Sequence, residues 1–207
     1  MYLSRVEIDV NNWPKAKELT QLSAFHNWVE QSFPDEVESE DQEPHLWRID
    51  RLVNKEYLLI VSKSKPDSSS LLEYGVSGTV DIVDYDEFLS KIKSDQVMQF
   101  RLAADPSFKS KDGKVKPAVT VKEQVRWLLE QAEKNGFQVK IPELQIISRD
   151  WPIAFHQDSR RVRLSGIMFE GKLVVKGVDI FKQALTNGVG LEKTFGMGLM
   201  TVIPQAE

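Results

Sequence analysis

The chain has 207 residues, a length that suits one large domain or two small ones with a real hydrophobic core. Hydrophobic residues make up 41% and charged residues 28%, which excludes a disordered chain and a fibrous repeat. No run approaches the roughly 20 apolar residues of a membrane span, and the early acids Glu7 and Asp9 are not typical of a signal peptide. The chain has no cysteine, which excludes disulfides and thiolate metal sites and fits the cytoplasmic location that we expect.

Charge is distributed unevenly, although the net charge is only −4. Residues 1–100 contain 10 Lys and Arg against 19 Asp and Glu, a net of −9, and residues 101–207 contain 17 against 12, a net of +5. The asymmetry fits an anion-binding second half. Chance together with one acidic loop, residues 35–43, explains it as well, so charge alone decides nothing.

The first half is predicted to run strand, helix, strand, strand, helix. Residues 2–9 alternate as a strand does, and an apolar stripe from Leu19 to Phe33 at steps of three and four predicts a helix that Pro34 ends. The pair Asn54-Lys55 between two apolar runs predicts a hairpin. The expected bounds are 46–52 and 57–61 for its strands, 64–70 for a Ser-rich loop and 85–93 for a short helix.

The second half is predicted to repeat this pattern and to add a final strand. A capping box of Thr120 and Glu123 opens a helix that Gly136 ends. The other expected elements are a strand over 97–103, an extended segment over 137–147, a hairpin over 162–175 that turns at Glu170-Gly171-Lys172, a short helix over 181–186 and a last strand over 199–203.

This order of elements predicts two ferredoxin-like α+β domains in tandem, with antiparallel sheets. We expect residues 1–94 to form the first domain and residues 95–207 the second. One continuous mixed sheet is the alternative.

The densest chemical signal is a glycine-rich segment over residues 188–199. Four glycines with Lys193 between them allow backbone N–H groups to approach a phosphate closely; they are Gly188, Gly190, Gly196 and Gly198. The segment is not a P-loop, because no glycine immediately precedes Lys193-Thr194. A tight loop between a helix and the final strand explains the glycines equally well.

Glycines placed in this way before a final apolar strand resemble the signature of the CRISPR-associated RNA-binding superfamily. Three further features narrow the resemblance to the CasE family: the opening Met1-Tyr2-Leu3-Ser4, Phe100-Arg101-Leu102 before Asp105-Pro106, and a histidine seven residues before Phe33-Pro34. The resemblance covers residues 1–204. It implies an endoribonuclease of the Escherichia-type (type I-E) Cascade system that cleaves CRISPR repeat RNA without metal or cofactor and stays bound to the mature crRNA beside other Cascade subunits.

His26 is the candidate catalytic residue. It follows Phe25, one position off the apolar stripe, and its imidazole, with an ordinary pKa of about 6.5, can give or take a proton during RNA cleavage. Taken alone, it is more simply interpreted as a surface histidine without a role. The resemblance, by contrast, implies that the catalytic histidine of the family falls at this position. The family often has a tyrosine three residues earlier. Ser23 stands there in this chain, which leaves the proton-transfer partner of His26 open.

Two basic stretches are candidate contacts for an RNA stem. The resemblance implies that the second half of the chain binds the phosphates of such a stem. The first alternates lysines across a Gly113 turn and the second begins the later hairpin; together they contribute Lys109, Lys111, Lys114, Lys116, Arg160, Arg161 and Arg163. Solvated loops are the plainer interpretation of both. His45 and His156 have no histidine or carboxylate at ligand spacing, so we expect them to be solvated or structural.

The sequence therefore predicts a metal-independent endoribonuclease that cuts CRISPR repeat hairpins. A non-catalytic RNA-binding subunit of the same ribonucleoprotein is the alternative, and it would not need His26. A small-ligand-binding α+β protein is a third possibility, which retention of a repeat hairpin at moderate salt would exclude.

Overall fold

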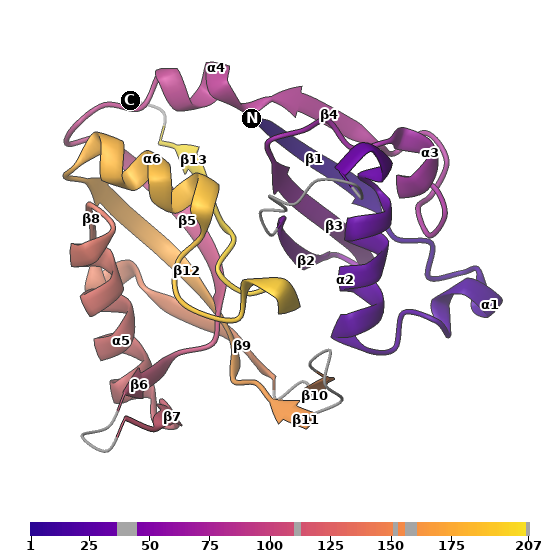
Figure 1. Ribbon diagram of the computed structural model, residues 1–207. Helices are drawn as coiled ribbons and strands as arrows, with labels where there is room; N and C mark the ends of the chain where they lie inside the picture. The colour runs from indigo at the N-terminus through magenta and orange to yellow at the C-terminus, as the bar shows by residue number, and fades with distance from the viewer. Residues whose placement is uncertain (37–44, 110–112, 151–152, 156–160, 206–207) are drawn as a thin grey trace. The chain divides into compact units, whose positions relative to one another are not determined.

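The computed structural model describes residues 1–36, 45–109, 113–150, 153–155 and 161–205 (Figure 1). The chain folds into two compact units. Unit 1 consists of residues 1–90 together with two later segments, 153–162 and 193–196. Unit 2 consists of residues 91–152, 163–192 and 197–207. The glycine-rich segment thus begins and ends in unit 2 and contributes its middle to unit 1.

Unit 1 is built around a sheet of four strands. Its described elements are β1 (Tyr2–Glu7), α1 (Trp13–Ala16), α2 (Leu22–Gln31), η1 (Pro34–Glu36), β2 (Leu46–Leu52), β3 (Lys55–Ser62), α3 (Ser68–Leu71), β4 (Asp81–Asp84), α4 (Tyr85–Ser90), β10 (Ile153–Phe155) and η3 (Lys193–Phe195). Strand β11 (Arg161–Arg163), which pairs with β10, begins in unit 1.

Unit 2 is built around a second sheet and carries a small hairpin. Its described elements are β5 (Val97–Ala104), β6 (Ser107–Lys109), β7 (Val115–Pro117), α5 (Val121–Lys134), β8 (Phe137–Val139), η2 (Ile141–Glu143), β9 (Gln145–Asp150), β12 (Gly166–Val175), α6 (Val178–Asn187) and β13 (Met200–Pro204).

Both main sheets have the same strand order. The first reads β2-β3-β1-β4 and the second reads β13-β5-β12-β8, with β9 also paired to β12, and the pairs are antiparallel. We number the four strands of each path along the chain, so that β5, β8, β12 and β13 are the first to fourth strands of the second sheet. In both sheets the fourth strand then lies beside the first, the first beside the third and the third beside the second. This is the order of the ferredoxin-like βαββαβ fold. The prediction of tandem ferredoxin-like α+β units is confirmed, and the alternative of one continuous sheet is wrong.

The core of unit 1 forms where α2 packs on its sheet. Phe25, Trp28 and Val29, at helical steps of three and four, are buried against β-strand residues such as Val6 and Leu58. The Trp28 indole N–H donates to the Ser70 carbonyl at 3.1 Å and so ties α2 to α3. Because Phe25 is buried in this core, its neighbour His26 is held at the margin of the buried face.

The first predicted helix is shorter than its apolar stripe. Residues 13–16 form a separate turn of helix and α2 begins only at Leu22, so Leu19 packs against the core from a turn, and Phe33 packs there after the helix has ended. The Ser-rich segment expected to be a loop contains the short helix α3, because Asp67 caps it by accepting the Ser70 N–H. The prediction also missed β4, which brings only two apolar residues to its pairing with β1.

The hairpin predicted to turn at residues 170–172 is wrong, because β12 is one strand of ten residues that pairs with β5 over most of its length. Gly171 lies inside this strand. A Cβ there would stand 2.9 Å from the Glu143 carbonyl oxygen, so glycine lets the backbone of η2 approach the strand. Glu170 pairs with Arg101 on the neighbouring β5.

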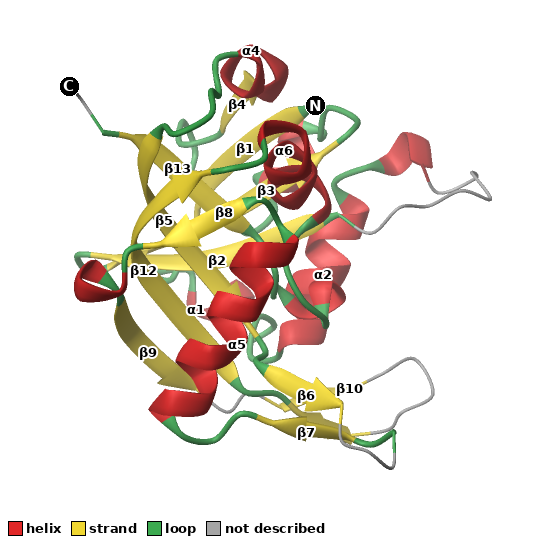
Figure 2. Ribbon diagram, turned by 90° about the vertical axis from the view of Figure 1, so that its left-hand side faces the viewer, coloured by secondary structure: helices red, strands yellow, loops and turns green. Residues whose placement is uncertain are grey.

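Helices α5 and α6 supply the apolar layer of unit 2, and Figure 2 shows them beside the sheet. The predicted capping box is confirmed, because Thr120 accepts the Glu123 N–H and Glu123 accepts the Thr120 N–H. The lysine-bearing stretch forms the hairpin β6–β7, which the Arg126 guanidinium anchors to α5 by lying 4.3 Å from the centroid of the Phe108 ring. Among the described segments, no helix is long and apolar enough to cross a membrane.

Candidate functional site

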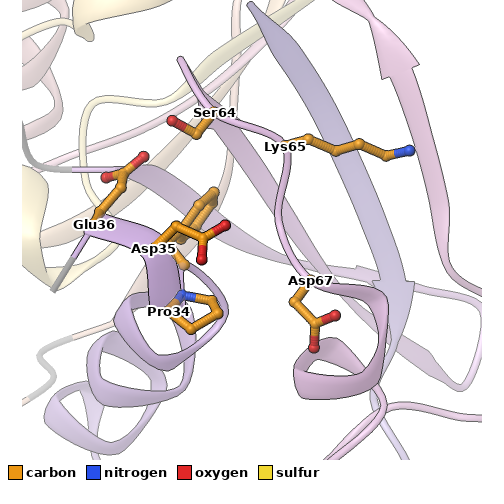
Figure 3. Close-up of a pocket in the computed structure, with 7 residues that line it drawn as sticks. Pro34, Asp35, Glu36, Ser64, Lys65 and Asp67 are labelled. Carbon is orange, nitrogen blue, oxygen red and sulfur yellow. The ribbon is translucent and has the colours of Figure 1, made fainter.

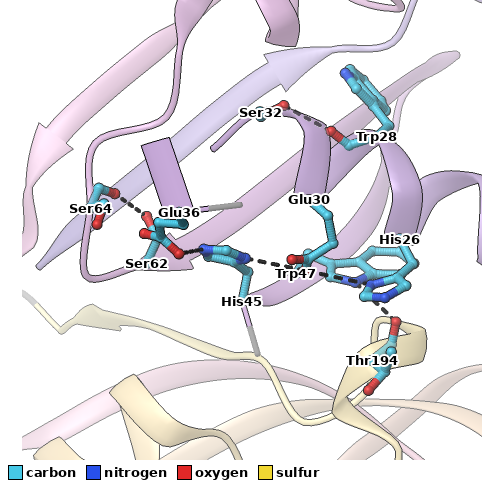
Figure 4. A network of polar contacts seen from close by, with 10 residues as sticks. All are labelled: His26, Trp28, Glu30, Ser32, Glu36, His45, Trp47, Ser62, Ser64 and Thr194. Atoms are coloured by element: carbon cyan, nitrogen blue, oxygen red, sulfur yellow. Dashed lines mark hydrogen bonds and ion pairs between the residues drawn. The ribbon is translucent and has the colours of Figure 1, made fainter. Parts of the chain in front are cut away.

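One face of α2 carries the candidate catalytic histidine. Ser23, His26 and Glu30 follow one another at steps of three and four, so their side chains share that face. The His26 side chain is 25% exposed, and its Nδ1 is buried without a hydrogen-bond partner among the described residues. Glu30 Oε1 lies 3.7 Å from this nitrogen (Figure 4). Nε2 is therefore the ring nitrogen left to meet a substrate.

The electrostatic surroundings of His26 favour a neutral imidazole. Burial lowers the pKa of His26 below its ordinary value because the charged form loses hydration. The Glu30 carboxylate acts in the opposite direction and raises this pKa by a smaller amount, and His45 lowers it. A neutral imidazole near pH 7 is in the protonation state that accepts a proton.

His45 is a buried structural residue, so the structural interpretation of this histidine is confirmed and the solvated one is wrong. Its ring stacks on Phe33 with centroids 3.8 Å apart and planes 7° apart. Its Nδ1 lies 3.2 Å from Glu30 Oε1, and its Nε2 lies 3.1 Å from Glu36 Oε2. His156 lies outside the described residues.

The network of His26, Glu30, His45 and Glu36 was not predicted from the sequence. The position of Glu30, four residues after His26 on a helix, is a signal that could have found the first contact. The contacts of His45 join the start of β2 to α2 and η1, and no spacing in the sequence indicates them.

The glycine-rich segment is fixed by close packing on aromatic rings. Its four glycines all have positive φ, between 75° and 89°. A Cβ on Gly196 would stand 2.7 Å from the Trp47 ring, and one on Gly190 would stand 2.9 Å from the Trp127 ring. The Trp47 indole N–H donates to the Thr194 carbonyl at 3.2 Å.

Three glycine amides of this segment already have backbone acceptors. The Gly196 N–H donates to the Lys193 carbonyl at 3.2 Å, and the Gly198 N–H donates to the Ala103 carbonyl. Both glycines are buried, and Gly188 donates to the end of α6 at Ala184. Packing therefore explains these glycines without a phosphate, and their role in RNA binding stays a prediction.

Within unit 1, two short segments from the second half of the sequence contact α2. The short helix η3, with the half-buried Lys193, and the strand β10 both pack beside it. Strand β11 pairs with β10 and contains Arg161 and Arg163, whose side chains lie outside the description. Arg160 lies outside the described residues.

The lysine stretch belongs to the other unit. Lys109, Lys114 and Lys116 are exposed on or beside the strands of the hairpin β6–β7. Lys111 lies outside the described residues. Strands β6 and β7, which carry Lys109 and Lys116, pair antiparallel on either side of Gly113.

A polar pocket of about 350 Å³ opens beside η1 (Figure 3). It is lined by Phe33, Pro34, Asp35, Glu36, Ser64, Lys65 and Asp67. Three carboxylates against one ammonium group repel a phosphate, so this pocket does not suit an RNA backbone. Across the described ranges, no group of three or more His, Asp or Glu side chains is arranged to hold a metal ion.

Comparison with known proteins assigns the chain to a family. The family described as "CRISPR associated protein" matches residues 1–204. The chain belongs to this family. The resemblance to its CasE-type endoribonucleases, inferred from the residues, is confirmed by a curated relative and by solved structures.

The relatives of this family member match over nearly their whole length. The CRISPR-associated endoribonuclease Cse3 of Thermus thermophilus is 26% identical over 216 residues, covering 99% of this chain and 100% of the relative. A structure of Cse3 bound to a 19-nucleotide RNA is 25% identical, has a TM-score of 0.81 and covers 98% of both chains. A chain of a CRISPR RNA-guided surveillance complex has the same fold, with a TM-score of 0.72 at 19% identity over 99% of this chain and 100% of that one.

The packing of the glycine-rich segment on Trp47 predicts a stability difference between two alanine variants. Gly78 has a φ of 80° with nothing within 4 Å, so Gly78→Ala tests the backbone cost alone, about 1–2 kcal/mol. Gly196→Ala has a similar φ and also meets the Trp47 ring, so we expect it to cost a further ~1–3 kcal/mol. Denaturant unfolding measures both, and equal losses would show that the indole does not constrain this position.

Proposed function

We propose that this CRISPR-associated protein is a metal-independent endoribonuclease that cuts the repeat hairpins of a precursor CRISPR RNA, with His26 as the proton-transferring residue. The observation that carries the proposal is the half-buried His26 on α2, whose pKa burial lowers so that the imidazole is neutral and able to accept a proton. The family membership and the RNA-bound relative Cse3 support the same substrate class.

In the proposed reaction the ribose 2′-OH attacks the adjacent phosphorus. The neutral His26 imidazole takes the 2′ proton as the O2′–P bond forms, and the P–O5′ bond breaks. The leaving 5′ oxygen takes a proton from the imidazolium so formed or from water. The products are a 2′,3′-cyclic phosphate and a 5′-hydroxyl, so atoms and charge balance without a metal ion.

The position of His26 among its neighbours supports this role. The basic residue Lys193, on η3 beside α2, can balance the charge that develops on the phosphoryl oxygens. Ser23 lies on the same helical face as His26, and we propose that it contributes at most a hydrogen bond to the phosphate, because a hydroxyl is a poor proton carrier.

We propose that the chain holds the RNA stem through its basic hairpins and keeps its product. The exposed lysines of β6–β7 are suited to phosphate contacts, and the segment from Arg160 to Arg163 supplies a second group. Since a chain of the same fold occurs in an RNA-guided surveillance complex, we propose that this protein remains on the mature crRNA as a Cascade subunit. In this proposal unit 1 contains the residue that cleaves the RNA, and unit 2 supplies many of the contacts that bind it.

A non-catalytic RNA-binding subunit is the competing function, and His26→Ala separates the two. We expect this variant to keep the fold and to bind a repeat hairpin nearly as tightly as wild type, because affinity depends on phosphate contacts. Its single-turnover cleavage rate should fall by about 10²–10⁴-fold, the usual contribution of a general acid or base. Ser23→Ala, on the same helical face, is the matched control and should lose far less.

Near-normal cleavage by His26→Ala would contradict the assignment. Lys193 would then be the next candidate for the proton-transferring group. A wild-type protein that binds the hairpin without cutting it would favour the non-catalytic alternative.

The lysine hairpin predicts a salt-dependent loss of affinity. Changing Lys109, Lys111, Lys114 and Lys116 together to glutamine should weaken RNA binding and flatten the plot of log affinity against log salt. Each lost phosphate contact removes about 0.7 to 0.9 from the slope. The charge-matched control changes four exposed lysines elsewhere, Lys17, Lys63, Lys65 and Lys93, and should leave the slope near that of wild type. An unchanged slope in the hairpin variant, or an equal change in the control, would show that the phosphate contacts come from other residues.

A further inference from the structure

We propose that Glu30 is a positioning residue for His26, and that the buried His45, held on its other side by Glu36, fixes where the Glu30 carboxylate lies. The proposal deepens the proposed function and rests on it, because it explains how the proton-transferring imidazole is oriented. It concerns four side chains of unit 1 that Figure 4 shows joined in one chain of contacts.

One carboxylate oxygen lies between two imidazole rings. Glu30 Oε1 is 3.2 Å from Nδ1 of His45 and 3.7 Å from Nδ1 of His26. The first distance is that of a hydrogen bond, and the second is slightly too long for one. Contacts of catalytic residues are often long in the absence of substrate and tighten when it binds. A proton on Nδ1 of His26 that faces this oxygen leaves the Nε2 lone pair for the ribose 2′-OH.

His45 is rigidly placed, so it can hold the carboxylate still. Its ring is buried and stacked on Phe33, and its other nitrogen meets Glu36 at 3.1 Å. Both ring nitrogens of His45 therefore face a carboxylate, one on α2 and one on η1, and these two contacts fix the position of the ring together with the stacking on Phe33. His45 also lowers the pKa of His26, in the direction opposite to the effect of Glu30.

Among the residues that the structure describes, few elements bring a charged group to His26. Helix α3 and strand β10 pack against α2 and carry no charged residue, and η3 carries Lys193. On α2 itself the charged group is Glu30, and the start of β2 contributes His45. Glu30 is thus the neighbour that raises the pKa of His26 against the effect of burial.

These contacts predict two separate effects of Glu30→Gln. Loss of the carboxylate removes the group that orients Nδ1, so the plateau rate of single-turnover cleavage should fall, by up to about 10²-fold for a misplaced catalytic group. Loss of its negative charge should lower the pKa of His26 further, so the imidazole stays neutral to a lower pH. The acid limb of the pH–rate profile should therefore move to lower pH, which a merely structural defect would not cause.

The experiment measures single-turnover cleavage of a repeat hairpin between about pH 5 and pH 8, together with hairpin affinity and thermal unfolding. Glu30→Asp keeps the charge and shortens the side chain, so it should retain the acid limb of wild type at a reduced plateau. Glu133→Gln, an equal charge change at an exposed position of α5, is the matched control and should behave as wild type. An unmoved acid limb in Glu30→Gln, or an unchanged plateau, would overturn the proposal.

A second measurement tests the orientation of the His26 ring in the wild-type protein, without a cleavage assay and without a variant. Nitrogen-15 spectra of the wild-type protein report which ring nitrogen of each histidine carries the proton, and three histidines are few enough to assign. We expect neutral His26 with its proton on Nδ1, and a proton on Nε2 instead would overturn the proposal. Should wild type fail to cut RNA, the proposed function fails whatever these spectra show. Should His26→Ala abolish cleavage and Glu30→Gln leave rate and acid limb unchanged, the positioning role alone fails.

Discussion

The partial burial of one imidazole is the constraint on which the functional account depends. His26 is adjacent to Phe25, which is buried in the core of unit 1, so the ring is held at the edge of that core and loses part of its hydration. Desolvation penalises the charged form, and the pKa of His26 falls below its ordinary value. The packing of α2 on its sheet thereby sets both the position and the protonation state of the candidate base.

The glycine-rich segment shows that one sequence signal can have two physical causes. Positive φ and close approach to Trp47 and Trp127 require Gly196 and Gly190 whether or not a phosphate is bound. The same packing places η3, with Lys193, beside α2 in unit 1. This arrangement puts a basic residue beside the helix that carries His26, whether or not the amides of the segment contact a phosphate.

Much of the fold was predictable from local signals. The alternation in β1 and the capping box at Thr120 indicated the right elements, because each depends on residues close together in the sequence. Strand β12 was misread, because Gly171 between Glu170 and Lys172 is typical of a turn and only the approach of η2 explains it as part of a strand. Strand β4 was missed, because pairing with β1 rather than its own hydrophobic pattern makes it a strand.

The site was less predictable than the fold. The resemblance singled out His26, whereas its place on the helix, taken alone, favoured a surface histidine without a role. The contacts of His45 with Glu30 and Glu36 depend on how β2, α2 and η1 pack, and no local pattern encodes them. The apolar environment of the imidazole is likewise a property of the packed core, so its effect on the pKa could be described only with the structure.

The central claim is that protein side chains, with no metal ion, move the protons when the 2′-OH attacks phosphorus. Analysis of the product ends after incubation of a labelled repeat transcript with the protein in excess EDTA tests it most directly. The account predicts a 2′,3′-cyclic phosphate and a 5′-hydroxyl, formed at an undiminished rate, and no cut where the nucleotide upstream of the cleavage position lacks its 2′-OH. Cleavage that stops in EDTA and returns with magnesium, or that leaves a 3′-hydroxyl and a 5′-phosphate, would contradict it.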